Sequence, residues 1–64
     1  MKRRDLISHS KAHGCVLDRE GGAHSFWWNP ATNRKTAVPR HHEVNNNTAK
    51  QLCRDLGIPP STKK

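Results

Sequence analysis

The stretch that decides the fold is Arg19–Pro30, with the sequence REGGAHSFWWNP. It holds every Phe and Trp ring of the 64-residue chain, together with two of its four glycines. Paired glycines allow a tight turn, because glycine adopts backbone conformations that other residues rarely take. Aromatic residues favour a pleated, half-buried strand. The stretch therefore predicts a hairpin turn at Gly21-Gly22 that places His24 at the beginning of a strand.

The sequence leaves open which face of this strand is buried. Strict alternation places His24, Phe26 and Trp28 on one face and Ser25 and Trp27 on the other, and neither set is a clean core face. A β-bulge after the glycines would change this parity, and glycine is a common site of bulges. In so small a core we expect at least one of Trp27 and Trp28 to be buried. The exposed one could stack on unpaired RNA bases or anchor a partner protein.

Two further strands are expected beside this one. In residues 15–19, Cys15 and Leu17 alternate with Val16 and Asp18, which predicts a first strand with one mostly apolar face. Residues 35–38 predict a short third strand, which Pro39 ends because proline donates no ladder hydrogen bond. The two short connections predict an antiparallel meander.

A helix is expected at each end of the meander. Residues 3–13 predict the first helix, with Gly14 as its stop. Residues 48–56 predict the second, which the run Asn45–Asn47 begins and Gly57 caps. Its core stripe follows the i, i+3, i+4, i+7 spacing and consists of Ala49, Leu52, Cys53 and Leu56.

The expected fold class is therefore α+β in the order α-β-β-β-α, with a three-stranded antiparallel sheet and two helices on one face. We expect one domain over residues 1–58 and a flexible tail over residues 59–64. Val44 is expected to dock the loop that precedes the second helix.

The charge predicts a polyanionic partner. Twelve Lys and Arg stand against five Asp and Glu, a net charge of +7. Nucleic acid is the simplest such partner, and a solvated basic surface is the plain alternative. The sequence has no apolar run long enough to cross a bilayer and no basic amphipathic helix, so we expect a cytoplasmic protein without membrane contact.

We expect no cofactor, no metal and no disulfide framework. Two cysteines at apolar positions predict reduced, packed thiols. His9 and His13 have helical i, i+4 spacing, but no third ligand is placed to complete a metal site. His41 and His42 beside Cys53 could suggest zinc, but neighbouring loop histidines rarely converge on one ion.

Four features in this order resemble the HicA toxins. They are the glycine turn before His24, the Asn29-Pro30 turn, the phrase Val38-Pro39-Arg40-His41 and the closing Leu56-Gly57-Ile58. The resemblance covers about residues 2–58. Many members have Gly-Ser where this chain has Gly22-Ala23, and Gly-Thr where it has Asn47-Thr48.

The resemblance implies a fold similar to double-stranded-RNA-binding domains and an mRNA interferase toxin that a HicB antitoxin holds inactive. The family's catalytic histidine maps onto His24, and the glycines before it map onto Gly21 and Gly22.

The residues support such chemistry independently. A histidine titrates near cellular pH and can act as base or acid on RNA, whose own 2′-hydroxyl is the nucleophile. This predicts metal-independent transesterification that leaves a 2′,3′-cyclic phosphate. Cations can stabilise the charge that develops on phosphate, and others can hold flanking phosphates. The candidates are Arg19, Arg40 and His41 near the reacting phosphate, with His41 a conceivable second acid, and Lys11 and Lys35 along the RNA.

Two other functions remain open from sequence. A non-catalytic RNA-binding module of the same shape explains charge and fold but leaves His24 without a role. A protein-interaction subunit, whose basic face meets an acidic partner, explains the charge alone.

Overall fold

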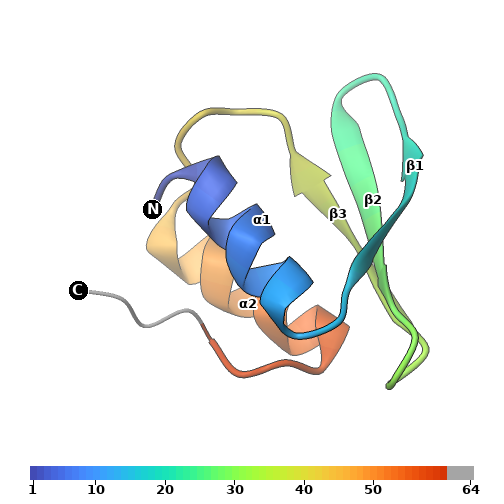
Figure 1. Ribbon diagram of the computed structural model, residues 1–64. Helices are drawn as coiled ribbons and strands as arrows, with labels where there is room; N and C mark the ends of the chain where they lie inside the picture. The colour runs from blue at the N-terminus through green and yellow to red at the C-terminus, as the bar shows by residue number, and fades with distance from the viewer. Residues whose placement is uncertain (61–64) are drawn as a thin grey trace.

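Three strands form an antiparallel meander in the order β1-β2-β3, and both helices lie on one of its faces in the computed structural model (Figure 1). This confirms the predicted α+β fold and its α-β-β-β-α order. The structure describes residues 1–60. The elements are α1 (Arg3–Ala12), β1 (Val16–Glu20), β2 (His24–Asn29), β3 (Arg34–Pro39) and α2 (Asn46–Leu56).

Strand β2 alternates strictly between the two faces of the sheet. Ser25, Trp27 and Asn29 are buried beneath the helices. Their neighbours His24, Phe26 and Trp28 therefore lie on the face turned away from the helices, which we call the outer face. No bulge interrupts β2 after the glycines; the irregular register lies in β1, between Leu17 and Arg19. The buried face of the second strand is therefore the one that carries Trp27.

The core lies between the sheet and the helices. The predicted stripe of α2 is buried as a whole, and Val44 is buried as expected. Both cysteines are buried too. The apolar core cluster consists of Leu6, Cys15, Trp27, Val38, Val44, Ala49, Leu52, Cys53, Leu56 and Ile58.

The helix ends follow their local signals. Gly14 and Gly57 adopt left-handed backbone conformations with φ of 87° and 72°, which glycine takes without strain. The side chain of Asn45 accepts a 2.8 Å hydrogen bond from the backbone N–H of Asn47, so α2 begins with a capped turn. In α1, the small Ser10 occupies a core-facing position and satisfies its hydroxyl by donating to the Leu6 carbonyl oxygen at 3.0 Å.

The mostly apolar face predicted for the first strand is not buried. All five residues of β1 are exposed, and Leu17 retains 44% of its accessible surface. Cys15 is buried but precedes the strand. The reason is that β1 is an edge strand that diverges from the helix layer, as Figure 1 shows, so its inward-facing side chains meet little of either helix.

The predicted tail over residues 59–64 lies mostly outside the described residues, which end at residue 60. Within the described part, His9 Nε2 lies 2.7 Å from the carbonyl oxygen of Pro59. The chain thus returns to α1 immediately after the second helix.

Candidate functional site

The β1–β2 hairpin places the candidate histidine. Residues 21–23 connect the two strands, and the Gly21 N–H donates to the His24 carbonyl oxygen at 2.8 Å. A Cβ on Gly21 would lie 2.7 Å from Phe26 Cε2 and 3.0 Å from that same carbonyl oxygen. A Cβ on Gly22 would meet nothing within 4 Å. Neither glycine adopts the left-handed backbone, so the predicted reason for the pair is wrong: close approach requires Gly21, and nothing in the fold requires Gly22.

His24 is the first residue of β2 and is exposed. It pairs with Pro39 across the β2–β3 ladder, so Arg40 and His41 follow directly from the residue opposite it. Its place on the outer face leaves the imidazole open to solvent, without a helix above it. A ring in this position can meet a large substrate.

Arg40 is anchored at the β1–β2 hairpin. Its Nη2 donates to Glu20 Oε1 at 2.5 Å and to the Gly21 carbonyl oxygen at 2.8 Å. The same Glu20 oxygen accepts a 2.7 Å hydrogen bond from the Ser25 hydroxyl. Arg3 Nη2 in turn donates to that hydroxyl at 2.8 Å. One carboxylate thus links the ends of all three strands to α1.

The Arg40–Glu20 pair contributes orientation more than stability. Its two side chains remain 44% and 51% exposed, and exposed ion pairs contribute only about 0–1 kcal/mol. Sequence reasoning missed Glu20, because its partners come from β2 and from the end of β3. The one sequence feature that could have indicated this role is the position of Glu20 directly before the two glycines.

The predicted RNA-contacting cations divide between the two faces of the sheet. Arg19 pairs with Phe26, and its guanidinium carbon lies 4.8 Å from the centre of that ring. Lys35 pairs with Trp28 at the far end of the same face. Lys11 lies on α1, with its Nζ 5.9 Å from the centre of the Trp27 ring. The outer face therefore gathers Arg19 and Lys35 with His24, and Lys11 belongs to the helix side.

The two tryptophans have opposite environments. Trp27 is 5% exposed and packs in the core. Its buried Nε1 has no hydrogen-bond partner among the described residues. Trp28 is half-buried on the outer face, and its Nε1 donates to Asn33 Oδ1 at 3.2 Å. Of the two tryptophans, Trp28 leaves more of its surface accessible to solvent.

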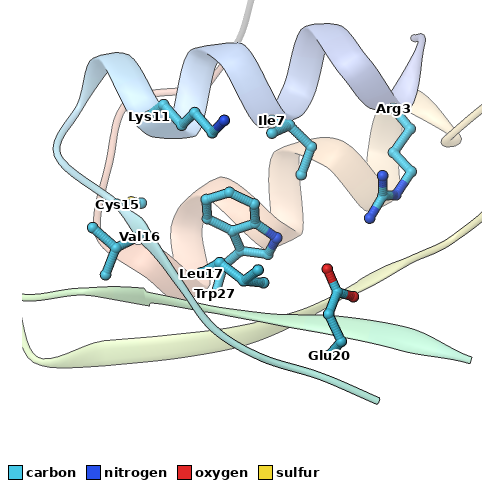
Figure 2. Close-up of a pocket in the computed structure, with 8 residues that line it drawn as sticks. All are labelled: Arg3, Ile7, Lys11, Cys15, Val16, Leu17, Glu20 and Trp27. Carbon is cyan, nitrogen blue, oxygen red and sulfur yellow. The ribbon is translucent and has the colours of Figure 1, made fainter. Parts of the chain in front are cut away.

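A groove of about 470 Å³ separates α1 from β1 (Figure 2). The exposed Val16 and Leu17 form its strand side, and the Trp27 ring forms its floor. Lys11 and Arg3 reach over it from α1, as Figure 2 shows. The groove combines exposed apolar surface with a basic rim. Its lining consists of Arg3, Ile7, Lys11, Cys15, Val16, Leu17, Glu20 and Trp27.

Within residues 1–60, no three His, Cys, Asp or Glu side chains gather in a way that could hold a metal ion. His9 and His13 stack edge to face, with ring centres 4.7 Å apart. In the part of the chain that the structure describes, neither helix has the length and apolar character needed to cross a membrane.

A comparison with protein-family models matches residues 3–58 to the family described as the HicA toxin of bacterial toxin–antitoxin systems. The matched region runs from the beginning of α1 to the residue after the α2 cap, and so includes the hairpin, His24 and the end of β3. No curated protein and no solved structure matches the chain significantly.

Proposed function

This chain belongs to the HicA toxin family of bacterial toxin–antitoxin systems, and on that premise we propose that it is an endoribonuclease that cleaves mRNA in the cytoplasm. His24 is its acid–base catalyst, and a HicB-type antitoxin neutralises it. The observation that carries the proposal is the exposed His24 at the beginning of β2, opposite the Pro39 that precedes Arg40, whose guanidinium Glu20 and Gly21 hold at the same end of the sheet.

The proposed reaction uses the nucleophile that RNA already carries. His24 removes the proton of a 2′-hydroxyl, the 2′-oxygen forms a bond to the adjacent phosphorus, and the bond from phosphorus to the 5′-oxygen breaks. The leaving 5′-oxygen takes a proton from a second acid or from water, and His41 is the candidate for that acid. The products are a 2′,3′-cyclic phosphate and a 5′-hydroxyl. General acid–base help of this kind contributes roughly 10²–10⁴-fold.

Arg40 supplies the electrostatic part of the proposal. Negative charge increases on the phosphoryl oxygens as the fifth bond to phosphorus forms, and a preorganised cation stabilises it. Only Nη2 of Arg40 is engaged by Glu20 and Gly21. The rest of the guanidinium keeps donors for a phosphate, because an arginine has five N–H groups.

The toxin–antitoxin family implies an antitoxin partner, and the groove between α1 and β1 supports a protein contact there. Val16 and Leu17 are 45% and 44% exposed. Large exposed apolar side chains beside a basic rim suit a partner segment with an apolar anchor and a carboxylate. Among the predicted partner contacts, Trp27 reaches this groove as its floor, whereas Trp28 lies on the outer face.

The test is RNA cleavage by the purified chain in EDTA, with His24→Ala beside it and product ends identified. His42→Ala is the matched control, because His42 is also exposed but lies in the loop after β3, outside the proposed site. We expect cyclic or 3′-phosphate ends from the unmodified chain and from His42→Ala, and none from His24→Ala. If the folded, unmodified chain leaves RNA intact while binding it, the enzyme proposal fails and an RNA-binding module takes its place.

A further inference from the structure

The outer face of the sheet carries a row of rings that the core does not need. His24, Phe26 and Trp28 alternate along β2, so neighbouring members are about 6.7 Å apart along the strand. Both helices lie on the opposite face of the sheet (Figure 1). Phe26 and Trp28 are only partly buried there. Large aromatic rings on an uncovered sheet face offer flat surfaces to a ligand.

Each aromatic ring has a cation on a neighbouring strand. Arg19 of β1 stands opposite Phe26, and Lys35 of β3 stands opposite Trp28. Arg19 already lies over the Phe26 ring, with its guanidinium carbon 4.8 Å from the ring centre, and a guanidinium plane is itself a stacking surface for bases. Arg40 lies at the His24 end of the sheet, but its guanidinium shares Glu20 Oε1 with the buried Ser25 and so belongs to the helix side. The row thus combines rings for bases with positive charge for the backbone that joins them.

We propose that the outer face is a stacking platform for single-stranded RNA, on which unpaired bases rest against Phe26 and Trp28 and lead the backbone to His24. The inference rests on the proposed function, since it names the form of RNA that the same site takes. Bases in a duplex are already stacked on each other, so only unpaired bases can use these rings. The distance from His24 to Trp28 is about 13 Å along the strand, which limits the platform to a few nucleotides on one side of the cleaved bond.

The position of the rings argues for RNA over a protein partner on this face. The exposed Leu17 stands opposite Trp27 and lines the groove on the helix side, whereas Val16 stands opposite Trp28. On the outer face Phe26 stands opposite Arg19, and Trp28 stands opposite Lys35. A polyanion with flat bases fits that combination, and stacking tolerates any base because each has a π-face.

The experiment measures binding of a fluorescein-labelled 2′-O-methyl oligouridine, which cannot be cleaved, by fluorescence anisotropy. The central variant is Trp28→Leu, which keeps apolar volume on the sheet but removes the aromatic ring. We expect it to weaken binding about 5- to 150-fold, the range that loss of one stacked base predicts. Trp28→Phe keeps a ring and is expected to restore most of the affinity. Unfolding in urea, followed by the remaining Trp27 fluorescence, reports whether each variant is folded.

The charge of the platform has its own matched pair. Lys35→Gln removes the cation opposite Trp28, whereas Lys50→Gln makes the same change on the exposed side of α2. We expect weaker binding and a shallower salt dependence for Lys35→Gln only. A duplex of the same length, annealed to its complement, is expected to bind the unmodified chain less tightly than the single strand.

Three results would overturn the platform: equal affinity of Trp28→Leu and the unmodified chain, preference for the duplex, or loss of antitoxin binding in Trp28→Leu with RNA binding intact. Because the oligonucleotide is not cleavable, these outcomes are independent of catalysis. Stacking on Trp28 without cleavage of natural RNA would keep the platform and reject the nuclease. Cleavage of natural RNA that is unaffected by Trp28→Leu would keep the nuclease and reject the platform.

Discussion

Substituting Gly21 by alanine should damage the hairpin, and the same change at Gly22 should not. A Cβ at residue 21 would lie 2.7 Å from Phe26 Cε2 and 3.0 Å from the His24 carbonyl oxygen, whereas carbon atoms in good contact are about 3.5–4.0 Å apart. One obstacle is a ring edge that can tilt, but the other is backbone, which already accepts the Gly21 N–H at 2.8 Å. The strand therefore has to move at the residue that carries the imidazole.

The expected cost of Gly21→Ala is about 2 kcal/mol, in the middle of the range for overpacking. For a domain of this size that lowers Tm by roughly 8–16 °C. Gly22→Ala meets open space at an ordinary backbone conformation, so restricting the unfolded chain should make it neutral or about 0.4–1 kcal/mol more stable. Urea unfolding by tryptophan fluorescence measures both, and RNA cleavage is expected to fall with Gly21→Ala alone.

A second-site change separates the clash from a general effect of alanine. Phe26→Leu removes Cε2, so Gly21→Ala made in a Phe26→Leu background should cost less than it does alone. Equal destabilisation by Gly22→Ala and Gly21→Ala, or an unchanged cost of Gly21→Ala when the Phe26 ring is absent, would rule out this steric clash.

Three other predictions follow from the described contacts. Asn45→Ala should lower the free energy of unfolding by about 1 kcal/mol, because it removes the side chain that caps α2. Asn47→Ala keeps the backbone N–H that the cap uses, so it should cost little in the same urea titration. Equal costs would contradict a side-chain cap. Burial, with a smaller effect of the second cysteine, raises the pKa of Cys15 above its ordinary value of 9.0. The folded state therefore holds this proton more tightly than the unfolded state, and the free energy of unfolding should decline as pH rises above about 9. The decline should be smaller in Cys15→Ala. A free energy of unfolding that does not change with pH in this range would argue against the raised pKa. Leu6 is 1% exposed, so Leu6→Ala should lower the free energy of unfolding by about 2–5 kcal/mol, and Leu17→Ala by at most about 0.5 kcal/mol. Thermal unfolding measures both, and a larger loss for Leu17→Ala would contradict the prediction.

Local signals in the sequence were sufficient for the element order. The stripe of α2 repeats at helical spacing and is buried as predicted, because a helix can bury only one face and the periodicity names it. Gly14 and Gly57 take the left-handed conformations expected after each helix. His24 could be singled out from its place behind a glycine turn, which depends on neighbours in the chain alone.

Sheet pairing decided what local signals could not. Both faces of β2 carry an aromatic ring, so alternation alone does not say whether Trp27 or Trp28 lies under the helices; the answer depends on which face α1 and α2 cover. The pattern of β1 indicates one mostly apolar face, but an edge strand that diverges from the helices leaves that face exposed.

The sequence by itself determined the helices, their caps, the hairpin and the candidate histidine, because each depends on residues a few positions apart. Only the tertiary structure placed Glu20 against Arg40, since 20 positions of chain separate them and the ladders of β2 bring them together. It also distinguished Gly21 from Gly22. A Cβ on Gly21 would clash with the Phe26 ring and the His24 carbonyl oxygen of β2, whereas a Cβ on Gly22 would meet nothing. Contacts of this kind arise from long-range pairing and close packing, which no local pattern encodes.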